Sequence, residues 1–538
     1  MARNAMWPSA VGQVLASVLM LVALNGFAMG QSAPGDSYAR TEGRWIVDGQ
    51  GRVLILHGVN VANSCKAPPF LPWQSKDEIA WLRKAGFDSV RYLTVWEAVE
   101  PQPGQYDDSY LDQVAERLEW CREAGLKVVL DMHQDLYSRK YGGDGAPEWA
   151  CVDDGLEYSH PGGGWFMAYM SPAVMRAFDN FYANKPGPGG VGIQDRFIAM
   201  WQHVAKRFRD DTNVIGYNVI NEPSYGSAFG TIIGAMAMGA MQQLGPEAGA
   251  ALAGQGGDPA SSGDAIAGIV KALLERDALF PALDAASAPA QEFERAVLQP
   301  FYNRVVAAIR EADPHHVIFL DPPPGDMSGA LLRSGLEAPQ DAAGRPFPNL
   351  VFSLHFYDFS TNFDFPYTGT SAYLKEFLAR AQQRGDSMGM PTWFGEWGTW
   401  SPQVERPDGG LLVRHHMDAF DELLCGWAYW QYGKEFQDLA VMPLITRPYA
   451  EAIAGVPSRM HSTDERFELD FAPLENGGET VIWVPPSTEA EVEVAFAGKG
   501  TAQTSRDDSG AVRVTCSPGA DACTVTISLS GKGWSSAR

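Results

Sequence analysis

Eight short apolar runs alternate with amphipathic segments through the middle of the chain. The runs are rich in β-branched and aromatic residues, which favours strands, whereas the segments between them repeat apolar residues every three or four positions, which favours helices. Because parallel strands need connections of a dozen residues or more, this alternation predicts an α/β fold, a closed (β/α)8 or TIM barrel. The runs are 53–62, 87–96, 126–135, 214–223, 316–324, 350–358, 391–399 and 425–433, and the helical segments are 75–85, 109–125, 193–209, 292–312, 371–385 and 410–424.

The pattern changes near residue 457, where apolar and polar residues begin to alternate with a period of two. Segments such as RFELDFAP, ETVIWVPP and CTVTISL are separated by Gly, Asp, Ser and Pro, without a helical pattern between them. This arrangement predicts an antiparallel β-sandwich. We therefore expect a barrel over 31–457 and a C-terminal β-sandwich over 458–538.

An insert over 226–290 follows the fourth run and is rich in Ala, Gly and Met, with few charges. One interpretation is a pair of packed helices joined by a Gly-rich connector. The other is an exposed apolar surface that makes transient contact with lipid.

Residues 1–30 have the pattern of a cleaved signal peptide. Arg3 precedes a mostly apolar run over 11–29, and Ala28 and Gly30 suit a signal peptidase site. An uncleaved membrane anchor is the alternative, which polar residues inside the run disfavour. We expect a secreted or periplasmic protein.

The chain is strongly acidic, with 65 Asp and Glu against 41 Lys and Arg and a formal net charge of -24. Such a surface repels phosphate backbones and anionic lipid, which excludes a nucleic-acid partner. Any approach to a lipid surface must therefore rest on apolar patches.

The six cysteines contain no CxxC pair, and the histidine pairs lack the spacing of metal ligands, so we expect neither a metal nor a cofactor. Cys516 and Cys523 flank a turn between two alternating runs, and export permits disulfides, so we predict that they pair. Whether Cys65 pairs with Cys151 stays open. Cys121 and Cys425 are predicted to be buried thiols.

Polar residues gather at the ends of the predicted strands, where a TIM barrel carries its chemistry. Glu222 ends the fourth run and Glu396 ends the seventh, within FGEWG. Strands four and seven lie on opposite sides of the barrel mouth, so the two carboxyls are able to face each other. Such a pair hydrolyses glycosidic bonds, and a separation of roughly 5–5.5 Å goes with retention of configuration. The alternative is that each glutamate is a salt-bridged residue at a strand end.

The motifs VRYLTVWEAVEP, DMHQD, NEP, HFY, FGEWG and the tryptophan ending the eighth run resemble glycoside hydrolase family 5. The loops DMHQDLYSRKYGGDGAPEWA and LHGVNVANSCKAPPFLPW are more particularly similar to those of endoglycoceramidases, which release the glycan of a glycosphingolipid at its bond to ceramide. The resemblance covers about 40–457 and the C-terminal sandwich. It implies a retaining endo-β-glycosidase acting on glycosphingolipids.

The resemblance also implies roles for individual residues. Glu222 matches the acid/base, and Glu396 matches the nucleophile, which the guanidinium of Arg91 would hold ionised. Asn221 would hydrogen-bond the sugar 2-OH. Three further roles are that Tyr357 donates to Glu396, that His355 tunes Glu222, and that His133 is the histidine after strand three.

Four more residues are candidates for binding sugar. Lys66 and Asp135 are able to bond adjacent hydroxyls, and Trp430 offers an apolar face to a pyranose. Tyr182 is the fourth candidate. The alternatives are a solvated lysine, a helix-capping aspartate and packed aromatic rings.

Other functions compete with the endo-glycosidase. They are an exo-β-glucosidase on glucosylceramide or a steryl glucoside, an endoglucanase on β-glucan, and a carbohydrate-binding protein that has kept the fold without activity. The presence of both glutamates argues against the last. We expect a monomer whose partner is a glycosphingolipid or another β-glycoside.

Overall fold

The computed structural model describes residues 38–162, 165–245, 268–324, 333–362, 365–399, 401–486 and 488–530. The predicted signal peptide and part of the predicted insert lie outside these residues. Residues 37–538 form one compact unit, so the boundary expected at residue 457 stays a prediction.

Eight parallel strands close into the predicted barrel, in the order β10-β11-β4-β5-β6-β7-β8-β9. Buried apolar side chains such as Val129, Phe319 and Trp393 belong to one core cluster contributed by several of these strands, and polar side chains follow toward the strand ends. The strands are β4 (His57–Val61), β5 (Ser89–Val95), β6 (Lys127–His133), β7 (Val214–Asn218), β8 (Val317–Leu320), β9 (Leu350–Phe356), β10 (Thr392–Trp397) and β11 (Gly426–Tyr429).

Helices lie at all six segments where the hydrophobic pattern predicts them, together with further helices that it did not predict, and local signals fix several of their ends. Ser75 and Glu78 form a capping box at the start of α2. Asp107 caps α4, and Gly125 ends that helix in a left-handed conformation at φ 76°. The helices are α2 (Lys76–Lys84), α3 (Trp96–Val99), α4 (Asp108–Ala124), α5 (Pro172–Tyr182), α6 (Ile193–Phe208), α12 (Gln299–Ala312), α13 (Phe359–Asn362), α14 (Ser371–Met388), α15 (Ser401–Val404), α16 (Pro407–Leu423) and α17 (Met442–Ile445).

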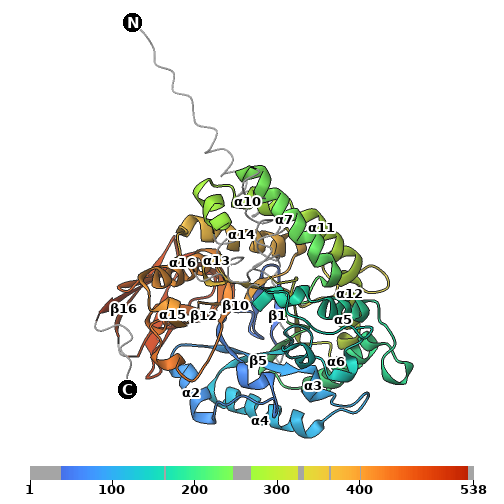
Figure 1. Cartoon of the computed structure of the whole chain (residues 1–538). Coiled ribbons are helices and arrows are strands. Elements are labelled where there is room, and N and C mark those ends of the chain that lie inside the picture. Colours follow the sequence, from blue (N-terminus) through green and yellow to red (C-terminus); the bar gives the residue numbers. More distant parts are fainter. Residues whose placement is uncertain are drawn as a thin grey trace. The chain divides into compact units, whose positions relative to one another are not determined.

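The described part of the insert consists of packed helices, as the first interpretation holds: α7 (Phe229–Leu244), α10 (Leu279–Asp284) and α11 (Ser287–Phe293) lie together in Figure 1. Its small residues allow close approach, since a Cβ on Gly239 would lie 2.1 Å from the Ala282 carbonyl oxygen. Within the described residues, no helix combines the length and the apolar character needed to cross a membrane.

Two antiparallel sheets complete the fold, and Figure 1 shows their C-terminal strands in orange and red. Two short N-terminal strands that the pattern did not predict, over 40–42 and 45–47, join the larger sheet, and the run 53–62 is divided between this sheet and the barrel. The larger sheet contains β1 (Arg40–Glu42), β2 (Trp45–Val47), β3 (Val53–Leu54), β12 (Tyr449–Ile453), β15 (Gly478–Trp483), β18 (Ala511–Cys516) and β17 (Ala502–Arg506). The smaller contains β13 (Gly455–Ser462), β14 (Arg466–Pro473), β19 (Cys523–Ser530) and β16 (Glu489–Phe496).

The cysteine prediction needs a correction. Cys516 and Cys523 lie on strands of different sheets with their sulfurs 4.0 Å apart, whereas a disulfide needs about 2.05 Å. All six cysteines are buried free thiols. The turn between the two cysteines therefore brings them into contact without a covalent bond, and Cys65 and Cys151 are likewise unbonded.

Candidate active site

A cavity of about 620 Å³ opens at the carboxyl ends of the barrel strands. It contains eight of the predicted site residues, while Arg91 and His355 are buried and contact the two glutamates. The eight are Lys66, His133, Asp135, Asn221, Glu222, Tyr357, Glu396 and Trp430.

Glu222 and Glu396 face each other in this cavity. Glu396 is part of β10, and Glu222 lies four residues beyond the end of β7. One carboxyl oxygen from each and a ring nitrogen of His355 all lie within 4.8 Å of one another. This short separation fits a retaining pair, because an inverting pair leaves room for a water molecule between the carboxyls.

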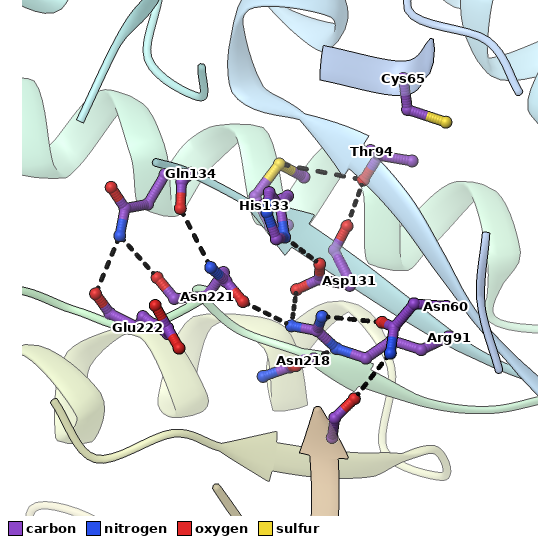
Figure 2. Close-up of polar contacts among 12 residues, drawn as sticks. Asn60, Cys65, Arg91, Thr94, Asp131, His133, Gln134, Asn218, Asn221 and Glu222 are labelled. Carbon is purple, nitrogen blue, oxygen red and sulfur yellow. Dashed lines mark hydrogen bonds and ion pairs between the residues drawn. The ribbon is translucent and has the colours of Figure 1, made fainter. Parts of the chain in front are cut away.

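Arg91 organises the floor of the site, as Figure 2 shows. Its guanidinium is fully buried and lies 2.8 Å from both Glu396 and Asp131. It also donates to the side-chain oxygen of Asn221 at 2.8 Å, and its remaining donors bind two further asparagines. Those two asparagines are Asn60 and Asn218. A planar, permanently charged donor set of this kind fixes several acceptors at once.

Glu396 has the partners of a fixed carboxylate. Its Oε1 accepts from Arg91 at 2.8 Å and its Oε2 accepts from the Tyr357 hydroxyl at 2.9 Å. Burial raises the pKa of Glu396, and the nearby His355 and Arg91 act in the opposite direction. The hydrogen bonds stabilise the charged form and hold it in one orientation.

Glu222 has the environment of a proton donor. Burial, followed by the negative charge of Asp135, raises its pKa to about 8. Its Oε1 lies 2.7 Å from Nδ1 of His355, whose own pKa is lowered by burial. The two glutamates thus differ in the way acid and nucleophile must differ, since Glu396 contacts a guanidinium and Glu222 contacts a histidine that burial keeps neutral.

A second group of polar residues forms another wall of the cavity. Lys66 forms an ion pair with Asp135 and lies 3.8 Å from Asp144. Its Nζ is 4.6 Å from the centre of the Trp430 ring, and the His133 ring lies nearly parallel to that indole at 5.6 Å. These residues present charged and hydrogen-bonding atoms beside an aromatic face, which suits a sugar ring.

His133 is held in place from two sides. Burial favours its neutral form, but the hydrogen bond to Asp131 and the nearby carboxylate of Asp135, 3.6 Å from Nε2, outweigh burial and raise its pKa to about 9. The contact with Asp131 is 2.8 Å, and Asp131 also binds Arg91. His133 therefore connects the sugar-facing wall to the floor of the site.

Tyr182 is the one predicted residue that neither lines the cavity nor contacts either glutamate in the described contacts. Its hydroxyl donates to the backbone carbonyl of Ser224 at 2.8 Å, and its ring packs against Phe178, Phe181 and Phe293. It supports the segment that follows Glu222 instead of lining the site.

Several site residues were missed by sequence reasoning. Asp144 lies in the Gly-rich loop after β6, where no strand pattern singles it out. Gln134 stands directly after β6, between the predicted His133 and Asp135, but its uncharged amide gave no signal of a chemical role. Asp131 lies within β6 and Asn218 is the last residue of β7, and the polarity of each was the available signal.

Two clusters among the described residues have atoms close enough to hold a cation: His133, Asp135 and Asp144, and Glu222, His355 and Glu396. In the first, the ammonium of Lys66 already contacts both aspartates. In the second, the guanidinium of Arg91 contacts Glu396. Side chains thus supply the positive charge that these carboxylates need, and the arrangement suits acid–base and nucleophilic chemistry.

Proteins of similar sequence include enzymes that act on glycosphingolipids by name. Endoglycoceramidase I of Rhodococcus hoagii (strain 103S) is 25% identical over 465 residues, which cover 83% of this chain and 79% of that protein. A glucosylceramidase of Rhizopus delemar is 28% identical over 240 residues, which cover 34% of this chain and 35% of that protein.

Solved structures of an endo-glycoceramidase have a similar fold. Endo-glycoceramidase II from Rhodococcus sp. superposes with a TM-score of 0.67 at 26% identity, over 92% of this chain and all of that one. That enzyme has also been solved as a lactosyl-enzyme intermediate and with ganglioside GM3. The cellulase family, glycosyl hydrolase family 5, matches residues 47–244 and 281–436. With this match and the paired glutamates, the chain belongs to glycosyl hydrolase family 5 and is a retaining glycoside hydrolase.

Proposed function

We propose that this enzyme is an endo-β-glycosidase that cleaves the bond between the glycan and the ceramide of glycosphingolipids. The proposal rests on a difference between two sides of the cavity, one of which is lined by charged groups and the other by aromatic side chains. Lys66, Asp135 and Trp430 form a polar, sugar-binding wall, whereas the segment after Glu222 contributes Tyr225 and Phe229. Because the acid/base residue contacts the leaving oxygen, residues beside it lie on the side of the leaving group, and here that side is aromatic.

The reaction follows in two steps. Glu396 attacks the anomeric carbon while Glu222 gives its proton to the leaving oxygen, which releases ceramide with a free hydroxyl and leaves a glycosyl ester on Glu396. Glu222, now ionised, then takes a proton from water as the water oxygen displaces Glu396. The products are the intact glycan, in its original configuration, and an enzyme with Glu222 protonated again.

A product screen tests the substrate. We expect incubation with lactosylceramide and ganglioside GM3 to release the intact glycan and ceramide, as seen by mass spectrometry. Release of glucose from glucosylceramide or a steryl glucoside, with no glycan from the longer lipids, would support the exo-β-glucosidase that similarity to the Rhizopus glucosylceramidase suggests. Activity on soluble β-glucan alone would reject both.

The helix α7 gives the proposed enzyme a surface for meeting lipid. Its sixteen residues, FGTIIGAMAMGAMQQL, carry no charge. Phe229 at its start lines the cavity, and Met238 further along is 55% exposed. An uncharged helix beside the site, on a protein of net charge -24, suits contact with a neutral lipid surface.

Charging this helix is expected to separate activity on lipid from activity on soluble substrates. Met238→Glu should lower the rate on lactosylceramide in phosphatidylcholine vesicles about tenfold, because burying a methionine contributes roughly 1.5–3 kcal/mol. Hydrolysis of a water-soluble aryl β-lactoside should not change. Val456→Glu, at a 43% exposed position on β13 in the smaller sheet, is the control and should affect neither. Equal losses on both substrates would contradict the role of α7.

The pH dependence should report the raised pKa of Glu222. The acid must be protonated for the first step, so kcat/KM should fall as pH rises through about 8, by about tenfold for each further unit. Rates on an aryl β-glycoside with a poor leaving group, measured from pH 4 to 10, show this limb. A descending limb near pH 4.5 would contradict the buried, protonated state.

We also propose that residues 1–30 direct export. The support is the apolar run over 11–29 behind Arg3. N-terminal sequencing of the protein recovered from outside the cytoplasm would show a start near residue 31, and recovery only of the full chain inside the cell would reject this.

A further inference from the structure

We propose that Gln134 is a positioning residue that holds the acid/base Glu222 in its reactive geometry. Gln134 follows β6 directly and is only 5% exposed. Its Nε2 donates to the backbone carbonyl of Asn221 at 2.7 Å and to that of Glu222 at 2.8 Å, as Figure 2 shows. One side-chain amide therefore bonds two successive carbonyls of the segment that carries the acid.

The backbone at Glu222 needs such a restraint. Its φ is 42°, in the left-handed region that a residue with a Cβ adopts only at an energetic cost. The side chain of Asn221 returns a hydrogen bond to the Gln134 carbonyl at 3.0 Å, so the two segments bind each other reciprocally. Rotation of the Asn221–Glu222 peptide toward a relaxed conformation would break these bonds.

The other end of the same amide restrains the sugar-binding loop. Oε1 of Gln134 accepts from the backbone N–H of Tyr137 at 2.8 Å, and Tyr137 has a φ of 73°. Gly145 packs so closely here that a Cβ on it would lie 2.5 Å from Cβ of Gln134. Asp135 and Asp144 lie between these positions, so one side chain links the aspartates that contact Lys66 to the acid/base residue.

The nucleophile is anchored independently. Arg91 and Tyr357 bind Glu396, and neither contacts Gln134 in the described hydrogen bonds. The bond from Arg91 to Asn221 uses Oδ1 of Asn221 and does not involve the amide of Gln134, so we expect it to persist when that amide is removed. Loss of this amide should therefore impair proton transfer by Glu222 and leave the attack by Glu396 intact.

Gln134→Met tests the proposal, because it keeps the length of the side chain and removes the donors and the acceptor. Gln403→Met is the matched control: Gln403 is 3% exposed, and its Nε2 also donates to two successive carbonyls, those of Ser360 and Thr361, at 2.9 and 3.4 Å. Both variants are assayed on a series of aryl β-glucosides and β-lactosides whose leaving groups differ in acidity, with thermal melting as a check on folding.

We expect kcat/KM of Gln134→Met to fall about 10- to 100-fold on phenyl glycosides, the scale of a misplaced catalytic group. It should fall less than about threefold on 2,4-dinitrophenyl glycosides, whose leaving group needs no proton. Azide, which attacks the glycosyl-enzyme without a general base, should restore kcat on the activated substrate. Gln403→Met should show neither the dependence on leaving group nor rescue by azide.

Two results would overturn the proposal: equal losses across the leaving groups, or a Gln403→Met variant with the same pattern. The pH profile of kcat/KM is a second measurement, which a merely structural role of Gln134 would not change. Its descending limb should shift to lower pH in Gln134→Met, because Glu222 gains access to water and its pKa falls. The inference rests on retaining hydrolysis and not on the lipid substrate, so failure of the glycosphingolipid screen would leave it standing.

Discussion

Replacing Glu396 with serine is expected to abolish turnover, by roughly 10⁴-fold or more, the scale seen when an enzyme loses its nucleophile. Serine is too short to reach the anomeric carbon, and the developing positive charge loses the carboxylate of Glu396 that faces it. The measurement is kcat on an aryl β-lactoside. Retention of more than about 1% of wild-type activity would contradict the assignment of Glu396.

Azide, added as a replacement nucleophile, shows from which face of the sugar Glu396 acts. The anion fits the space that Glu396→Ser leaves and should attack from that side, which gives a glycosyl azide of α configuration. Glu222→Ala is the matched variant, because its glycosyl-enzyme still forms on Glu396 from a 2,4-dinitrophenyl glycoside. Azide then attacks from the opposite face and gives the β product. Nuclear magnetic resonance distinguishes the two anomers, and an exchange of the expected configurations would reverse the roles of the glutamates.

The barrel and its paired glutamates were predictable because periodicity places side chains. An alternation of strand and helix makes the strands parallel, so their carboxyl ends meet at one mouth of the barrel, and polar residues at the ends of the runs lie there. The contacts of His355 with Glu222 and of Tyr357 with Glu396 were implied by the resemblance to the family, and the structure contains both hydrogen bonds.

The remaining features depend on partners far away in the sequence. The run 53–62 reads as one strand, yet β3 pairs with β12, whose residues lie about 400 positions later, while β4 enters the barrel. A local pattern carries no information about such a partner. Cys516 and Cys523 are close in the sequence, yet the predicted disulfide is absent, because their strands belong to different sheets and hold the sulfurs 4.0 Å apart.

Gln134 and Asp144 illustrate another limit. Their positions depend on left-handed turns at Leu136 and Tyr137 and on the close packing of Gly145, none of which has a periodic signature. Tyr182 was misplaced for a related reason: it belongs to α5, whose aromatic residues pack against neighbouring helices, so its hydroxyl reaches only the Ser224 carbonyl.

Arg91→Met is expected to cost both stability and activity. Among the described Lys and Arg side chains, Arg91 is the one that forms ion pairs with the buried carboxylates of Asp131 and Glu396, and the substitution removes it. Loss of one partner from a buried ion pair costs about 3–5 kcal/mol of folding free energy. The guanidinium also lowers the pKa of Glu396, so its removal should raise that pKa further. Glu396 must be ionised to attack, and the ascending limb of kcat/KM should therefore move to higher pH.

Denaturant unfolding and the pH profile measure the two effects separately. Arg83→Met provides the control, since Arg83 on α2 forms an ion pair with the buried carboxylate of Glu451 on β12, away from the cavity residues. It should lower the free energy of unfolding and leave the ascending limb in place. Arg91→Lys keeps the charge but not the planar donor set, so it should restore part of the pH limb without restoring full stability. If Arg91→Met left the ascending limb unmoved, other groups would keep Glu396 ionised, and Arg91 would not have the electrostatic role inferred from its contacts.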